Sequence, residues 1–358
     1  MLAMQPQSTS KIVSIWLFLC LVITVAIMVI SGTTRLLESG LSIMEWRPLN
    51  DLILPVQVNC EQEFKIYKAL PQFQKAFPNM EIEEFVMIYT LEYIRHVTES
   101  VLLIISLLPL LWFSIRHTLR ISDTLKLSAV FAFASLHYLS HFYIVKNALL
   151  DDPHFTPYRL SLQLALQFIF FGLILWQLLS FSYPKQGIGG FELPKPSIVP
   201  KVFAVLALAT IFLQIILGGA VSGLHAGLSY NTFPRMDNAW IPEGLWSIDP
   251  WYKNLFEDAT TAQFMHRMLA YGLSVLIPLF WLIGRTNPHI AHLLPILFSI
   301  FVVQFLFGVL TLLFVVPIPL SSMHQANAIL VFGIAVTITH RLFIPIKTIS
   351  YDTGNAIV

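Results

Sequence analysis

The chain has 358 residues, of which 56% are hydrophobic and 11% are charged, and its mean hydropathy is +0.73. Soluble domains carry about 25% charged residues, so this composition excludes an ordinary soluble protein. The formal net charge of +1 is not accompanied by a basic stripe, so the sequence indicates no nucleic-acid partner. The composition instead predicts an all-α membrane protein embedded in the lipid bilayer.

Eight apolar stretches are long enough to cross a bilayer, which requires about 20 predominantly apolar residues in a helix. In chain order they lie at about 12–31, 84–115, 125–145, 158–182, 200–222, 261–284, 290–316 and 320–343. The first stretch is long and is not followed by an A-x-A cleavage pattern. We therefore interpret it as a retained transmembrane helix rather than a signal peptide.

The basic residues between these stretches alternate in a way that predicts the orientation of the chain. One set of connections carries the lysines and arginines Lys11, Arg116, Arg120, Lys126, Lys185, Lys195, Lys201, Arg285, Arg341 and Lys347. The opposite connections carry the acidic residues Asp151, Asp152, Asp249, Glu257 and Asp258. We predict that both termini are cytoplasmic and that the long loops 35–83 and 224–260 lie outside.

The sequence also contains an internal repeat. The string SGTTRLLESGLSIMEWRP aligns with GGAVSGLHAGLSYNTFPRM, so that Gly32 corresponds to Gly219, Gly40 to Gly227 and Ser42 to Ser229. A polar external loop and an apolar helix beginning with EYIRH or QFMHR follow in each case. We predict two tandem four-helix bundles, 1–190 and 191–358, related as a parallel repeat and joined by the Gly- and Pro-rich linker FSYPKQGIGGFELPKPSIVP.

Two histidines stand out in the second half, because ionisable groups inside membrane helices usually mark function. His266 and His324 lie near the external ends of the sixth and eighth stretches. Neutral imidazoles from two helices of a bundle can bind one haem iron axially, and a neighbouring guanidinium such as Arg267 can pair with haem propionates. Alternatively, each histidine hydrogen-bonds a neighbouring helix. Spacing alone does not decide between these interpretations.

These strings resemble the haem A synthase family over nearly the whole chain. The second half carries GGAVSGLHAGLSYNTFPRMDNAWIP, TAQFMHR followed by AY, FGVLT and MHQANA. The first half carries TTRLLESGLSIMEWRP, EFKIYKALPQF and IVKNALLDDPHFTPYRLSL. The YNTFP and TAQF-x-HR strings are the most specific of these motifs.

The resemblance implies a bacterial inner-membrane oxidoreductase of eight helices that oxidises the methyl group of haem O to the formyl group of haem A. It implies haem B as a cofactor, ligated by His266 and His324, and haem O as a substrate bound in the first half between a second histidine pair. Glu92 matches a family glutamate that precedes the first of those histidines, where a carboxylate can relay protons. The structural alternative is a Glu92–Arg95 pair that only neutralises two charges. Haem O synthase and terminal oxidase assembly are the expected partners, and the oligomeric state is left open, a homo-oligomer included.

The first half departs from the family pattern at both expected ligand positions. The family pattern E-x-x-H-R is here E-x-x-R-H, so Arg95 stands where the first histidine is expected and His96 follows one residue later, about 100° round the helix. The pattern YRL-x-x-H is here YRLSLQ, which places Gln163 at the second position. Glutamine is a poor haem ligand, and a protonated arginine cannot coordinate a metal.

Other histidines could form a relocated site. His137 and His141 are four residues apart on the third stretch, a spacing that can bind one metal ion, and His96 lies on the second stretch. We consider two interpretations: a relocated haem or metal site, or a decayed site whose polar residues bond to each other or to water.

Three functions compete at this point. The chain is either a working haem A synthase, a non-catalytic member that binds haem B and serves haem handling or oxidase assembly, or a transporter. Transport is disfavoured because no helix is broken at mid-membrane by paired Gly or Pro residues. Family resemblance favours catalysis, and the altered first half favours the non-catalytic alternative.

Overall fold

A computed structural model describes residues 7–36, 60–69, 74, 79–148, 156–182 and 195–344. Within the helices, side chains are described outside 7–10, 34–36, 137–148 and 156. The described part of the chain is helical throughout, apart from turns, loops and one isolated β-bridge between Met236 and Ala239. The predicted all-α class is confirmed.

Each of the eight predicted apolar stretches is a helix. They are α1 (Gln7–Leu36), α4 (Ile82–Ile115), α5 (Ile121–Ala148), α6 (Thr156–Ser182), α7 (Ile198–Gly223), α9 (Ala259–Gly284), α10 (Leu294–Leu313) and α11 (Ile318–Phe343). Among the described residues, seven helices are long and apolar enough to cross a membrane. The exception is α5, whose side chains are described only as far as Leu136.

Shorter helices lie in the connections. These are α2 (Cys60–Lys68), α8 (Asn254–Glu257) and two single-turn helices, η2 (Ala226–Leu228) and η3 (Trp251–Lys253). The helix that contains EYIRH and the helix that contains QFMHR each have one proline, Pro109 in α4 and Pro278 in α9. Both helices remain continuous through the proline, which agrees with the expectation that neither is broken at mid-membrane.

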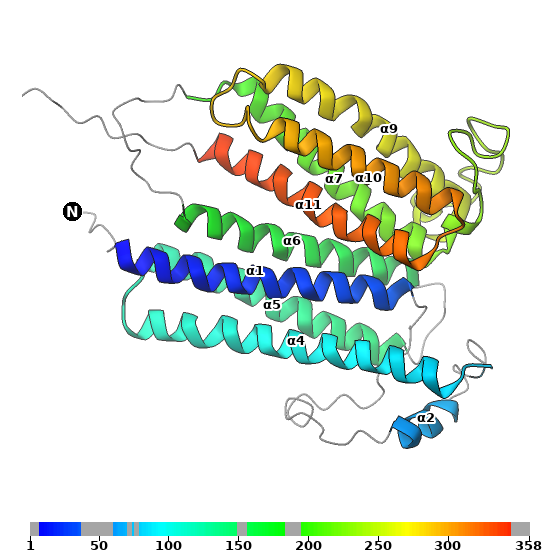
Figure 1. The fold of residues 1–358 in the computed structure, drawn as a ribbon, viewed down its shortest axis with the longest axis horizontal. Coiled ribbons are helices and arrows are strands. Elements are labelled where there is room, and N and C mark those ends of the chain that lie inside the picture. Colours follow the sequence, from blue (N-terminus) through cyan, green and yellow to red (C-terminus); the bar gives the residue numbers. More distant parts are fainter. Residues whose placement is uncertain are drawn as a thin grey trace, which may run out of the picture.

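The long helices form two adjacent groups (Figure 1). In the first group, α1 and α5 each pack against both α4 and α6. In the second group, α7 and α10 each pack against both α9 and α11. The groups meet where α6 contacts α7 and α11 and where α1 contacts α11. Many large apolar side chains remain exposed on the outer helix faces, as a lipid-facing surface requires.

At the boundary between the groups, α6 and α11 approach each other through two reciprocal contacts. A Cβ atom added to Gly172 in α6 would lie 3.3 Å from the ring of Phe332 in α11. A Cβ atom added to Gly333 in α11 would lie 3.3 Å from the ring of Phe171 in α6. Each glycine therefore makes room for a phenylalanine of the other helix, and Phe332 also packs edge-on against Phe168, with ring centroids 5.3 Å apart. Small residues allow this close approach, which drives helix association in lipid.

The amphipathic helix α2 packs on the first part of α4. Phe64 and Tyr67 are buried against Phe85, whose ring centroid lies 4.9 Å from that of Phe64 and 5.3 Å from that of Tyr67. Burial, together with the nearby Glu92 carboxylate, raises the pKa of the Tyr67 hydroxyl well above its usual range. The helix α2 therefore covers the end of α4 that carries the EYIRH sequence.

We predict that Gly333→Leu destabilises the contact between the two groups by about 1–3 kcal/mol, because the added side chain overlaps Phe171 and Leu175. Thermal unfolding of the purified protein in detergent measures the effect. Gly272→Leu in α9 is the matched control, since nothing lies within 4 Å of a Cβ atom at that exposed position. Equal unfolding temperatures for the two variants would show that the α6–α11 contact does not contribute to stability.

Candidate functional site

His266 and His324 come from facing helices at the same end of the second group. The helix α9 begins after Asp258, whose carboxylate accepts hydrogen bonds from the backbone N–H groups of Thr260 and Thr261 at 3.2 and 2.9 Å. The helix α11 begins after Pro317. Each histidine lies about two turns from the start of its helix. The structure therefore places the two predicted ligands at corresponding depths of their helices.

Glycines of the adjacent helices face both imidazoles. A Cβ atom added to Gly218 in α7 would lie 3.4 Å from Cε1 of His266. A Cβ atom added to Gly308 in α10 would lie 2.9 Å from Cε1 of His324, closer than real Cβ atoms come. A larger residue at Gly308 would therefore displace the imidazole. Glycine at both positions therefore makes room for the two rings.

His324 is oriented by α10. Its Nδ1 lies 3.1 Å from the backbone carbonyl oxygen of Gln304, so an Nδ1–H group can donate there and leave the lone pair on Nε2. The Gln304 side-chain nitrogen lies 3.3 Å from that Nε2, a contact that a ligand bound at Nε2 would replace. Asn327 fixes Gln304 in turn, donating to its Oε1 at 2.9 Å.

His266 has an unsatisfied ring nitrogen. Its Nδ1 is buried and has no hydrogen-bond partner among the described residues. The backbone carbonyl oxygen of His266 accepts a hydrogen bond from Gln214 Nε2 at 3.0 Å. A buried polar atom without a partner costs about 1–3 kcal/mol, which a bound ligand can recover.

Arg267, which sequence reasoning assigned to haem propionates, holds the loop between α7 and α9. Its guanidinium donates to the backbone carbonyl oxygens of Tyr230 at 2.8 Å, Thr232 at 2.9 Å and Arg235 at 3.3 Å. Tyr271, one turn further along α9, donates from its hydroxyl to the Pro234 carbonyl at 2.8 Å. The YNTFPR segment is thereby fixed to α9 next to His266, and the propionate role of Arg267 stays a prediction.

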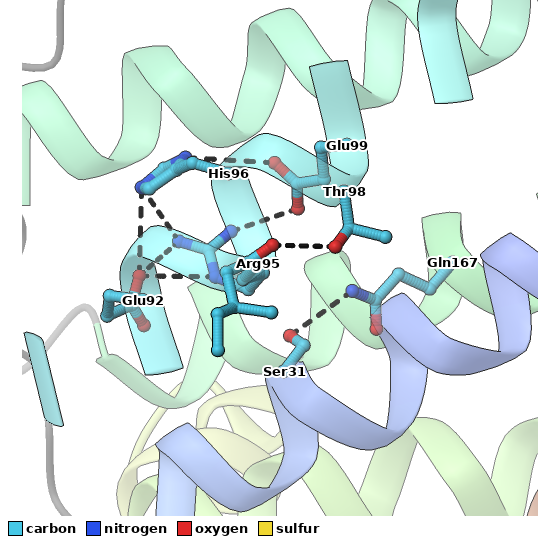
Figure 2. Close-up of polar contacts among 8 residues, drawn as sticks. Ser31, Glu92, Arg95, His96, Thr98, Glu99 and Gln167 are labelled. Carbon is cyan, nitrogen blue, oxygen red and sulfur yellow. Dashed lines mark hydrogen bonds and ion pairs between the residues drawn. The ribbon is translucent and has the colours of Figure 1, made fainter. Parts of the chain in front are cut away.

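The first group carries a different arrangement at the corresponding place. Figure 2 shows Arg95 of α4 between the carboxylates of Glu92 and Glu99, with the His96 ring beside them. The guanidinium donates to Glu92 Oε2 from Nε at 3.1 Å and also from Nη2, and to Glu99 Oε1 from Nη1 at 2.9 Å. All four side chains are buried. The Glu92–Arg95 pair that the sequence offered as a structural alternative is therefore present.

His96 lies at the edge of this ion-pair cluster. Its Nε2 is 3.2 Å from Arg95 Nη2 and 3.7 Å from Glu92 Oε2, and its Nδ1 is 3.9 Å from Glu99 Oε2. The ring is thus surrounded by charged groups of its own helix. Gln163 in α6 is half-buried. The predicted relocated site also needs His137 and His141, whose side chains lie outside those that the structure describes.

Glu99 is the residue that sequence reasoning missed. Its signal was the spacing of four residues from Arg95, which places both side chains on one face of α4. Sequence reasoning weighed only the carboxylate that precedes Arg95. The structure shows that Arg95 is shared between two carboxylates, one on each side of it.

The two groups differ in what they can bind. Within the described residues, no set of three or more His, Cys, Asp or Glu side chains could enclose a metal ion. His266 and His324 are instead two imidazoles, each facing a glycine of an adjacent helix, and this donor set fits the iron of a haem, whose ring supplies the remaining ligands. The described residues of the first group do not fit bis-histidine ligation, because Arg95 is engaged by two carboxylates and cannot coordinate.

Comparison with known proteins finds similarity over most of the chain. Residues 14–336 match the model of a family described as COX15-CtaA, cytochrome oxidase assembly protein. A heme A synthase of Nitrosospira multiformis is 37% identical over 342 residues, which cover 94% of this chain and 95% of the relative. Heme A synthases of Nitrosomonas eutropha and Wolbachia pipientis wMel are 33% and 35% identical, covering 92% and 90% of this chain and 93% and 91% of the relatives.

We predict that Arg95→Gln strongly destabilises the protein, by about 3–5 kcal/mol, because it leaves two buried carboxylates without a cation. The triple variant Glu92→Gln, Arg95→Gln, Glu99→Gln removes all three charges together and should recover most of the loss. Unfolding in detergent is the measurement. If the single variant is as stable as the parent protein, the cluster is not held together by its charges.

Proposed function

Because the chain belongs to the COX15-CtaA family of cytochrome oxidase assembly proteins, we propose that it is a membrane oxidoreductase of the haem A synthase type. The reaction oxidises the methyl group of haem O to the formyl group of haem A. The observation that carries the proposal is the facing pair His266 and His324, with its unsatisfied ring nitrogen and adjacent glycines. This pair would hold haem B in the second group of helices.

The residues around the pair support this assignment. Bound haem B would supply one-electron transfer. His324 would be held in one tautomer by the Gln304 carbonyl, and Asn327 would keep Gln304 in place. Arg267 would keep the external loop closed over this end of the bundle, which limits the access of water.

We further propose that the two groups are the halves of an internal repeat, with a boundary near residue 190. The order of packing supports this, because α1, α4, α5 and α6 contact one another in the same cyclic order as α7, α9, α10 and α11. The reciprocal contacts support it too. Gly172 and Gly333 are separated along the chain by the same number of residues as Gln163 and His324. A repeat with pseudo-two-fold symmetry accounts for both observations.

The first half is the proposed site of haem O. Its Glu92 carboxylate is buried at the position expected for the family glutamate, and it is the group that would accept a proton near the substrate. No iron ligation by Arg95 or Gln163 is part of the proposal.

A second candidate function follows from the same cluster. An arginine paired with two carboxylates stands where the second half has His266, which favours a member that binds haem B but does not oxidise haem O. Such a protein would act in haem handling or in terminal oxidase assembly. In both cases the proposed setting is the bacterial inner membrane, with both termini cytoplasmic and haem O synthase and the terminal oxidase as partners.

We predict that the purified protein shows the spectrum of a low-spin, bis-histidine haem B, and that His266→Ala or His324→Ala abolishes it. The reason is that each variant removes one axial ligand. His292→Ala is the control, since His292 is exposed and its Nε2 lies 2.7 Å from Nη1 of Arg341, away from the histidine pair. An unchanged spectrum in both ligand variants would remove the haem assignment.

We predict that co-expression with a haem O synthase yields haem A, and that Glu92→Gln lowers the yield at least tenfold, as expected when a general base is removed. Extraction of the pigments and chromatography provide the measurement. Glu84→Gln, at an exposed position of the same helix, is the control. Recovery of only haem O and haem B from the unaltered protein would select the second candidate function.

A further inference from the structure

A small pocket lies inside the first group of helices, beside the ion-pair cluster. Its volume is about 30 Å³, which is room for about two water molecules. All four helices of the group line it, with Thr24 from α1, Glu99 from α4, Ala134 from α5 and Gln167 from α6 among the lining residues. The remaining lining side chains are apolar. The pocket is thus lined mainly by apolar side chains, with a few polar groups among them.

Two of those polar groups are oxygen atoms that need a hydrogen-bond donor. Glu99 Oε2 and Gln167 Oε1 are both buried without a hydrogen-bond partner among the described residues, and the two residues are only 7% and 3% exposed. The other end of each side chain is engaged. Glu99 Oε1 accepts from Arg95 at 2.9 Å, and Gln167 Nε2 donates to Ser31 Oγ at 3.3 Å (Figure 2). Water in the pocket can donate to both oxygens, and a proton on Glu99 Oε2 would turn that oxygen from an acceptor into a donor.

The charges of the cluster lead to the same requirement. Arg95 carries one positive charge, whereas Glu92 and Glu99 would carry two negative charges if both were ionised. Of the other described groups that face the cluster, His96 on α4 has its Nδ1 3.9 Å from Glu99 Oε2, but its Nε2 lies 3.2 Å from Arg95 Nη2, which opposes a positive charge on the ring. Tyr67 on α2 is a neutral phenol beside Glu92. Thr24 on α1, Ala134 on α5 and Gln167 on α6 bring no charge. A net buried negative charge inside a membrane protein is costly, and binding one proton removes it.

The pocket has no polar counterpart in the second half. Glu99 corresponds to Ala270, by the alignment that pairs EYIRH with QFMHR. Gln167 corresponds to Ala328, at the same separation as Gln163 and His324, and Thr24 corresponds to Ile211, at the same separation as Gly32 and Gly219. All three polar wall residues are therefore replaced by apolar residues on the side of the histidine pair. The polar groups belong to the half that has the ion-pair cluster.

We propose that Glu99 is a proton-binding site inside the first group of helices. Its Oε1 accepts from Arg95, and its Oε2 carries the proton and donates it to water in the pocket, which can in turn donate to Gln167 Oε1. Arg95 and Glu92 then form the charged pair, and the cluster is neutral. Both unpartnered oxygens are satisfied in this state. The proposal rests on the packing around α4 and does not depend on the proposed function.

Infrared spectroscopy of the purified full-length protein in lipid nanodiscs tests the proposal without any measurement of activity. The unaltered protein should show the carbonyl-stretch band of a protonated carboxylic acid, and the band should shift in D₂O. Glu99→Gln and Glu92→Gln should each abolish the band, because the carboxylate that remains is then the sole counter-ion of Arg95. Gln167→Leu should shift the band without abolishing it, because the hydrogen-bond acceptor of the acid is lost.

Two variants control for unrelated carboxyl groups and for general effects on α6. Glu84→Gln, exposed on α4, and Gln177→Leu, on α6 away from the pocket, should leave the band unchanged. Absence of the band from the unaltered protein would overturn the proposal, as would its persistence in both glutamate variants. A band that Gln167→Leu does not move would come from an acid that does not face the pocket, and would also overturn the assignment to Glu99.

Discussion

The interior of a bilayer contains almost no water, so each polar group buried between membrane helices must be satisfied by the chain or by something bound to it. This constraint determines where the chemistry of the protein lies. Most of the buried side chains are apolar, and the buried charged ones include Glu92, Arg95 and Glu99 of α4. In the first group of helices an arginine is neutralised by carboxylates of its own helix. In the second group a histidine retains an unsatisfied nitrogen next to another histidine.

The ion-pair cluster of Arg95 in α4 and the imidazole of His266 in α9 differ in how their polar groups are satisfied. Arg95 brings its own counter-ions, because Glu92 and Glu99 flank it on the same face of α4. His266 forms no ion pair with a carboxylate among the described residues, and Gly218 lies against its ring. The charges of the first arrangement are paired within one helix, whereas the Nδ1 of His266 is left without a hydrogen-bond partner among the described residues. The helix packing around both is similar, so the difference lies in a few side chains and not in the fold.

The sequence predicted the fold well, because the length of an apolar stretch and the spacing of such stretches are set by the bilayer itself. All eight predicted stretches are helices. The helix α5 lies where it was predicted, but it is not among the seven candidate membrane spans, and its side chains are described only as far as Leu136. The sequence also indicated His266 and His324 as neighbours. It did not indicate that Arg267 would donate to the backbone carbonyls of the loop between α7 and α9. Every residue has a backbone carbonyl, so the residue types of a loop do not predict such hydrogen bonds. Nor did the sequence reveal Gln167, whose significance depends on which helices enclose the pocket.

The two groups of helices therefore share their packing and differ in their polar interiors. In the second group, each ring of the histidine pair lies against a glycine, Gly218 or Gly308, that makes room for it. In the first group, a buried ion pair needs close contact, because a charge separated from its partner by empty space is poorly stabilised. Both carboxylates lie within about one turn of Arg95, and the second carboxylate opens onto the pocket. An arginine at this buried position is therefore stabilised by carboxylates of its own helix, and Glu99 is the one that we propose binds a proton.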